Sequence, residues 1–193
     1  MKLTVNGEPV AKESVEREYQ RLLKALGPRI EPGELDRISP KLQRQALDHA
    51  IGRVLLLGEA RRREIRVAPE EIDRALAEVI RACGGEAGFQ THLAKLNLSP
   101  TDLRRQILEA RQTERLIEEI TKDCPQPEEE EITAYLTEHA HEFLAEEPHP
   151  ESEPVQAKIR ESAHRRLIAA GKNELLSGFI ARLKQSAAIK ASA

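Results

Sequence analysis

The segment LTVNGEPVAKESVEREY, residues 3–19, decides how the fold begins. It starts as a short apolar strand, turns at Asn6-Gly7 and opens a helix before residue 20. No neighbouring strand follows it in the sequence, and a lone two-stranded ribbon is marginal in water. The segment AAIKA, residues 187–191, is the candidate partner at the other end of the chain. We therefore predict an all-α fold in which a short two-stranded β ribbon joins the termini and is held by helices packed on it.

Between these ends, apolar residues recur at three- and four-residue steps, which is typical of amphipathic helices. The first helix is expected over about residues 12–26, where a Gly-Pro pair ends it. A second is expected to begin at Ser39-Pro40, with a capping hydroxyl and a proline in the first turn. Its section VLLLGEARRRE, residues 54–64, is apolar over nearly a full turn and is the expected centre of the core.

The rest of the chain predicts further helices. They are expected within VAPEEIDRALAEVIRACGG (67–85), within EAGFQTHLAKLNLSPTDLRRQILEARQTERLIEEI (86–120), where Ser99 caps and Pro100 opens the longer helix, and within DCPQPEEEEITAYLTEHAHEF (123–143). The segment AEEPHPESEP (145–154) carries three prolines and four glutamates and is expected to be a solvated linker. A last long helix is expected over residues 155–186.

The composition limits the classes of function. The chain has 193 residues, of which 39% are hydrophobic, 33% charged and 3% aromatic, and its mean hydropathy is -0.53. Its 30 basic and 33 acidic residues are interspersed and leave a net charge of -3, so no broad basic face for a phosphate backbone is expected and a nucleic-acid role is disfavoured. No stretch is apolar for the ~18 residues of a membrane span.

The order and spacing of these segments resemble the N-terminal chaperone domain of the SurA family over roughly residues 3–143. That family includes parvulin-type prolyl isomerase chaperones such as the PrsA-like foldases and the nitrogenase accessory protein NifM. The last helix and the AAIK ending look like the family's C-terminal helix and strand, which fold back onto the N-terminal domain. The resemblance implies a helical chaperone domain over residues 1–144, a linker over 145–154 and a C-terminal part, 155–193, that completes the same domain.

One part of the family's pattern is missing. A parvulin domain of roughly a hundred residues normally follows the helix that ends near Phe143, and the linker is too short to contain it. The sequence also has no phosphate-binding loop of the GxxxxGK[ST] type. The resemblance therefore implies ATP-independent binding of unfolded or partly folded polypeptides in an apolar helical groove, without catalysis and without a cofactor.

Two other functions stay open from the sequence. One is peptidyl-prolyl isomerase activity, as in most relatives, and the other is a dedicated accessory role for a single partner, as in NifM-like proteins. A homodimer is compatible with either. The compartment also stays open, because the chain as written has no signal peptide and is expected in the cytoplasm, whereas an upstream signal peptide that has been removed would place it in the periplasm.

No catalytic or metal-binding constellation follows from the spacing of reactive residues. His139 and His141 are two residues apart and point to different sides of a helix, and His149 with Glu151 lies in the linker. His164 is expected on a solvated face. Instead of a cation site, the four glutamates of residues 128–131 are interpreted as acids that stabilise a first helical turn.

The remaining candidates have structural interpretations. The arginines of EARRRE are expected to form intramolecular ion pairs with Glu59 and Glu64 instead of a phosphate site. Cys83 and Cys124 are expected to be buried or idle thiols, with a single disulfide as the alternative. The aromatic side chains are expected in the core, with one or two lining a client groove as the alternative; they are Tyr19, Phe89, Tyr135, Phe143 and Phe179.

Overall fold

The protein is described from a computed structural model, which covers residues 2–27, 32–146 and 152–192. The chain divides into two compact units. The first comprises Met1–Ile117 and Ile180–Ala193, and the second comprises Glu118–Phe179. The first unit therefore takes in both ends of the chain.

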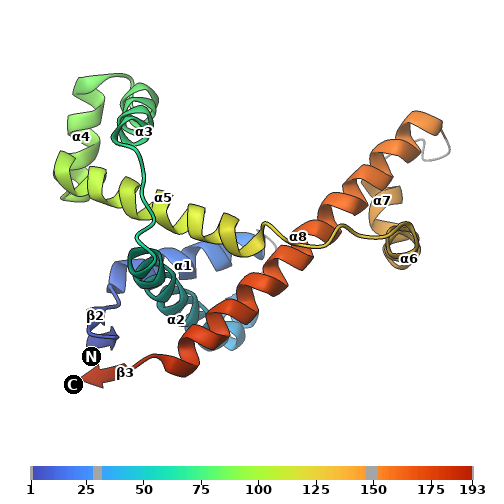
Figure 1. Ribbon diagram of the computed structural model, residues 1–193, viewed down its shortest axis with the longest axis horizontal. Coiled ribbons are helices and arrows are strands. Elements are labelled where there is room, and N and C mark those ends of the chain that lie inside the picture. Colours follow the sequence, from blue (N-terminus) through green and yellow to red (C-terminus); the bar gives the residue numbers. More distant parts are fainter. Residues whose placement is uncertain (1, 28–31, 147–151, 193) are drawn as a thin grey trace. The chain divides into compact units, whose positions relative to one another are not determined.

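The termini meet in a small antiparallel sheet. β1 (Lys2–Val5) lies between β2 (Glu8–Pro9) and β3 (Ile189–Ser192), and both ends of the chain lie together in Figure 1. Asn6 and Gly7 have φ of 52° and 86°, the left-handed pair that a tight hairpin of this twist requires. The predicted pairing of the two ends is confirmed. The sheet also has the third strand, β2, which makes it three-stranded instead of a two-stranded ribbon.

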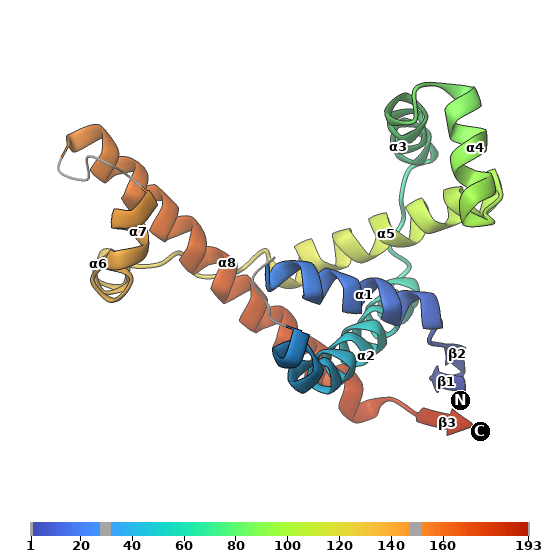
Figure 2. The same ribbon diagram turned by 180° about the vertical axis from the view of Figure 1, so that it is seen from behind.

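Helices cover the apolar face of this sheet. α1 (Lys12–Ala25) packs along α2 (Pro32–Arg62), as Figure 2 shows, and α2 also contacts β1. The shared core comprises Val5, Val10, Ala50 and Leu55, with partly buried neighbours around them. The prediction that the 54–64 section lies at the centre of the core is confirmed, since Leu55 and Leu56 are buried and Ala60 is fully so.

The expected start of the second helix at Ser39-Pro40 is wrong. α2 is already helical from residue 32, and Pro40 lies inside it, where it cannot donate a backbone hydrogen bond. Contacts with α1 hold the turn before the proline, because the Ser39 hydroxyl and the Tyr19 hydroxyl lie 2.9 Å apart in a hydrogen bond. Tertiary contacts therefore outweigh the local tendency of Ser-Pro to begin a helix.

After α2, the chain of the first unit forms α3 (Pro69–Ala82), α4 (Glu86–Leu96) and α5 (Pro100–Thr121). The last residues of α5 belong to the second unit. The predicted cap of α5 is confirmed: the Asp102 amide donates to Ser99 Oγ at 3.1 Å, and the Ser99 amide donates to Asp102 Oδ2 at 3.2 Å. An ion pair of 2.6 Å between Arg104 and Asp73 joins α5 to α3.

The second unit is built from α6 (Glu129–Glu138), α7 (Ala140–Glu146) and the greater part of α8 (Glu153–Ser186). Its core comprises Ile132, Phe143 and Ala163. The helix expected through residue 143 is interrupted at His139, whose φ of -104° ends α6 before α7 begins. Most of the expected linker, residues 147–151, lies outside the described residues.

The last turns of α8 return to the first unit. Lys184 Nζ donates to Asp48 Oδ1 of α2 at 2.5 Å, and Leu183 and Ala187 pack on the core beside β1. α8 therefore delivers β3 to the sheet. Within the described ranges, none of the helices combines the length and the apolar character needed to cross a bilayer.

Candidate functional site

The helical hairpin of α3 and α4 is a candidate site, because its apolar residues line a hollow and Leu96 at its end is exposed. The sequence sets its ends: Pro69 opens α3 with Glu70 and Glu71 behind it, and Gly84 and Gly85 turn the chain at φ of 79° and 101°. The apolar face of α3 is strongly developed, yet none of the residues of this fully described helix is buried. An amphipathic helix normally buries this face, whereas the apolar side chains of α3 are half-buried and leave part of the face accessible; they are Ile72, Leu76, Val79 and Ile80.

A hollow lies between the two helices of this hairpin. Small residues contribute to its lining, together with Val79 of α3 and Cys83, which directly follows α3; they are Ala82, Ala87 and Gly88. The first turn of α4 lies close to the turn after α3, because a Cβ built at Gly88 would collide with the carbonyl oxygen of Cys83. Only glycine fits this position.

The polar part of the lining comes from one face of α4. It consists of Thr91, His92 and Lys95, and all three are exposed. The Thr91 hydroxyl donates to the Ala87 carbonyl at 2.9 Å and is therefore occupied within its own helix. The hollow combines apolar side chains with the cation of Lys95, a lining that suits contact with another polypeptide.

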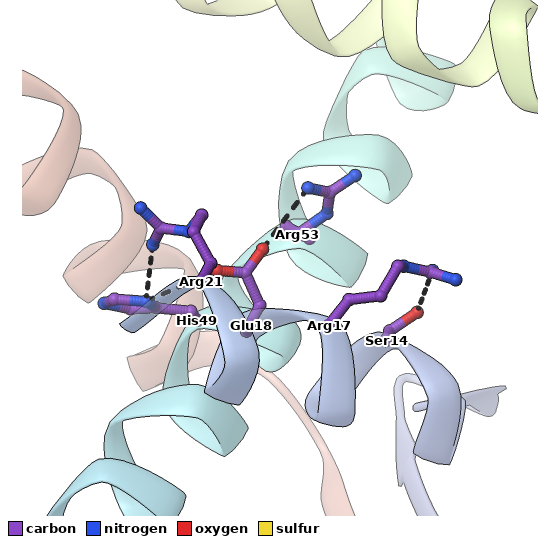
Figure 3. A network of polar contacts seen from close by, with 6 residues as sticks. All are labelled: Ser14, Arg17, Glu18, Arg21, His49 and Arg53. Carbon is purple, nitrogen blue, oxygen red and sulfur yellow. Dashed lines mark hydrogen bonds and ion pairs between the residues drawn. The ribbon is translucent and has the colours of Figure 1, made fainter. Parts of the chain in front are cut away.

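A buried carboxylate joins α1 to α2 elsewhere in this unit (Figure 3). Glu18 is only 8% exposed, and it accepts hydrogen bonds from Arg21 at 2.8 Å and from Arg53 at 3.4 Å. Burial by itself raises the pKa of Glu18, but the hydrogen bond and charge of Arg21, with the charges of Arg53 and His49, bring the pKa below its ordinary value. The carboxylate is thus held ionised and structural.

His49 of α2 lies beside this cluster. Its Nδ1 is 3.2 Å from the Arg21 guanidinium and 3.7 Å from the Glu18 carboxylate. These contacts tie α1 to α2, and we interpret the cluster as structural.

The arginines after the core section of α2 are also used inside the chain. Glu59 is 8% exposed and accepts from Arg62 at 2.7 Å through both oxygens and from Arg63 at 2.7 Å. The hydrogen bond from Arg62 contributes most to lowering the pKa of Glu59 to about 2, against the effect of burial, and Arg63 adds to it. Arg61 pairs with Glu8 of β2 and with Glu109 of α5. The interpretation of EARRRE as a set of intramolecular ion pairs is confirmed through Glu59, whereas Glu64 forms no ion pair within the described residues.

The histidines and acids of the second unit hold local structure. Glu128 and Glu131 form a capping box at the start of α6, which confirms the interpretation of this acidic run. His139 Nδ1 lies 2.9 Å from Glu142 Oε1, and that hydrogen bond, with Arg166, lowers the pKa of Glu142. His141 is exposed and His164 is half-buried.

The described residues contain no group of three or more His, Cys, Asp or Glu side chains placed to hold a metal ion. His149 and Glu151 lie outside these residues. Cys83 and Cys124 are both free and half-buried, so they do not form the disulfide that was the alternative. Cys83 faces the α3–α4 hollow, which its position in the sequence did not indicate.

The aromatic side chains are mainly structural. Phe89 is 2% and Phe143 is 4% exposed, as core residues should be. Tyr135 is half-buried and stacks on His139 with ring centroids 4.3 Å apart. Tyr19 hydrogen-bonds across to α2, and Phe179 is half-buried. None of the five lines the α3–α4 hollow.

Comparison with known proteins shows which family the sequence matches and which solved fold it is similar to. The sequence profile of a family described as the SurA-like N-terminal domain matches residues 3–117. The fold is similar to that of a solved chain, with a TM-score of 0.57 at 10% sequence identity, over 98% of each chain. That chain belongs to work on the virulence factor PEB4 and the periplasmic protein Cj1289, described as two structurally related SurA-like chaperones of Campylobacter jejuni. No curated protein matches the sequence.

Proposed function

Because the chain belongs to the family of the SurA-like N-terminal domain, we propose that it is an ATP-independent chaperone that holds unfolded or partly folded polypeptides. Binding takes place on apolar helical surface, and no covalent chemistry is involved. In this proposal, residues 155–193 complete the helical domain of residues 1–144, and residues 145–154 join them.

The observation that carries the proposal is the partly accessible apolar face of the α3–α4 hairpin. α3 has a strongly amphipathic sequence and no fully buried residue, and small residues line the hollow beside it. Leu96, at the end of α4, is 53% exposed. Apolar surface of this kind in a soluble protein is a common mark of a polypeptide-binding site.

The chemistry of the hollow favours breadth over specificity. Its apolar lining residues offer contacts without a deep, shaped cavity, and α4 adds the polar side chains of Thr91, His92 and Lys95. Weak apolar contacts at several places accept many sequences, because no single pairing decides the binding energy. A holdase needs this property, whereas an enzyme needs fixed groups around a reacting atom.

Substitution of two exposed alanines that line the hollow tests the proposal. The protein should suppress the aggregation of a heat-unfolded client several-fold less well when it carries Ala82→Glu or Ala87→Glu. Each substitution places a charge among the apolar residues that line the hollow. Ala77→Glu and Ala94→Glu are the matched controls, since they are exposed on the same two helices but outside the hollow. Equal loss in all four variants, at unchanged melting temperatures, would refute the assignment to this surface.

Three further measurements separate the proposal from its alternatives. Turnover of a chromogenic proline peptide above background would favour a prolyl isomerase, and the proposal expects none. Suppression of aggregation for several unrelated clients, with or without ATP, is expected of a general holdase. Activity on a single client would favour a dedicated accessory protein, and sedimentation would show whether the chain acts as the homodimer that the sequence permits.

A further inference from the structure

β3 forms one edge of the terminal sheet, and its outward backbone groups form no hydrogen bonds within the described residues. The Asn6 amide donates to the Ala188 carbonyl at 2.9 Å, and the Thr4 hydroxyl donates to the Lys190 carbonyl at 3.4 Å. Ala188 and Lys190 therefore direct their backbone groups towards β1. The backbone groups of successive residues in a strand point to opposite sides, so those of Ile189 and Ala191 face away from β1. In the described part of the chain, the N–H and C=O groups of Ile189 and Ala191 have no partner.

The apolar face of the sheet also stops at this edge. Ile189 lies opposite Val5, and Ala191 lies opposite Leu3, so each pair shares one face of the sheet. Val5 is 1% exposed and belongs to the core, whereas Ile189 is 44% exposed. A further strand beside β3 would cover Ile189 and extend the same apolar face.

We propose that this edge of β3 binds an extended segment of a non-native polypeptide, which adds a fourth strand and places an acidic residue opposite Lys190. The proposal rests on the proposed chaperone function and names one site and one class of segment for it. Recognition comes mainly from backbone hydrogen bonds to Ile189 and Ala191, which any extended sequence can make.

Lys190 determines which occupant the edge favours. Its side chain is exposed, points to the face opposite Ile189, and has no ion pair among the described residues. A residue directly opposite it would form a pair without backbone hydrogen bonds, in which side chains come closest. An acidic residue at that position is attracted, and a basic one is repelled.

The same geometry argues against a second copy of this chain as the occupant. Full two-fold pairing of two β3 strands, with Ile189 of one opposite Ala191 of the other, would set the two Lys190 side chains directly opposite each other. Like charges in this position destabilise the pair. Lysine on an exposed edge is a known device against self-association, and it leaves the edge available to a segment of opposite charge.

The test uses the full chain and two labelled heptapeptides. Both place valine on each side of a central residue and threonine outside, and the central residue is glutamate in one and lysine in the other. Nuclear magnetic resonance titration should shift the amide signals of Ile189 and Ala191, with the glutamate peptide bound about threefold more tightly. The glutamate peptide with N-methylated valines, which cannot donate, should not bind.

Two variants examine the edge itself. Lys190→Glu should reverse the preference, so that the lysine peptide binds more tightly. Ala191→Pro removes only an outward N–H, since proline is tolerated on edge strands, and should weaken the glutamate peptide about fivefold. Reversal by the first and weakening by the second, at unchanged melting temperature, support the proposal. An unchanged preference in Lys190→Glu overturns it, as does unchanged binding to an Ala191→Pro chain that is still folded.

Three additional outcomes distinguish the occupants and the two proposals. A concentration-dependent dimer that Ala191→Pro abolishes would show that the edge serves a second copy, which overturns the proposed occupant. Suppression of aggregation by a chain that binds neither peptide would overturn the edge and leave the chaperone function standing. Peptide binding by a chain that suppresses no aggregation would overturn the chaperone function and with it the client role of this edge.

Discussion

Replacing Glu59 by glutamine should destabilise the protein at neutral pH and do so progressively less in acid. The carboxylate is 8% exposed and is held by Arg62 and Arg63 at 2.7 Å. Its pKa falls from the ordinary 4.5 to about 2, mainly through the hydrogen bond from Arg62. A shift of this size corresponds to about 3 kcal/mol at most.

Exposure of the two arginines to water reduces the free energy that this pKa shift contributes to stability. The Arg62 side chain is 72% exposed and that of Arg63 is 31% exposed, so water screens both ion pairs. We therefore expect Glu59→Gln to lower the free energy of unfolding by about 1–2 kcal/mol at pH 7. Glutamine keeps the shape and one acceptor, so the loss reports the charge and not a cavity.

The pH dependence gives the sign of the effect. Because the pKa of Glu59 is lower in the folded state, its contribution is complete above pH 4.5 and is lost as the pH falls towards 2. Urea unfolding of the wild type and of Glu59→Gln, from pH 7 down to the lowest pH at which both fold, measures the difference. Glu64→Gln is the control, since Glu64 is exposed on the same chain segment. A difference that stays constant with pH, or an equal loss in the control, would refute the reasoning.

Four further changes test the packing. Gly88→Ala should destabilise the chain markedly, because the added Cβ would collide with the Cys83 carbonyl oxygen. Gly58→Ala in α2 adds a Cβ that meets nothing within 4 Å, and it should raise the free energy of unfolding by about 0.5–1 kcal/mol. Thermal melting of both variants tests these two expectations. Deletion of residues 188–193 removes β3 and should lower the melting temperature by several degrees, and an unchanged curve would contradict the pairing with β1. Ser99→Ala should cost about 1 kcal/mol in urea unfolding because the cap of α5 is lost, and a neutral result would contradict the cap.

Local patterns predicted most of the helices and the meeting of the termini. The Asn6-Gly7 turn and the AAIKA segment at the other end of the chain are short-range signals, and the structure has a tight turn at the first and a strand, β3, at the second. β2 was missed because two residues ending in a proline carry no alternation to detect. Pro40 misled the prediction because the turn before it is held by Tyr19, which lies 20 residues away along the chain.

The candidate site was less predictable than the fold. The apolar stripe of α3 is visible in the sequence, but the close approach of Gly88 to the Cys83 carbonyl is not, because periodicity does not report it. Glu18 has a partner in Arg53, which is 35 residues away in sequence and on another helix. Spacing reveals pairs within one helix, whereas partners that the fold brings together have no signal in a single sequence.

The terminal sheet has a consequence for the synthesis of the protein. Thr4 and its partner Lys190 are separated by 186 residues, so β1 leaves the ribosome long before its neighbour exists. At translation rates of about 5–20 residues per second, the nascent chain keeps this side of the first strand open for on the order of ten seconds or more. Closure of the sheet is therefore a late, slow event in folding, set by the separation of its two halves in the chain.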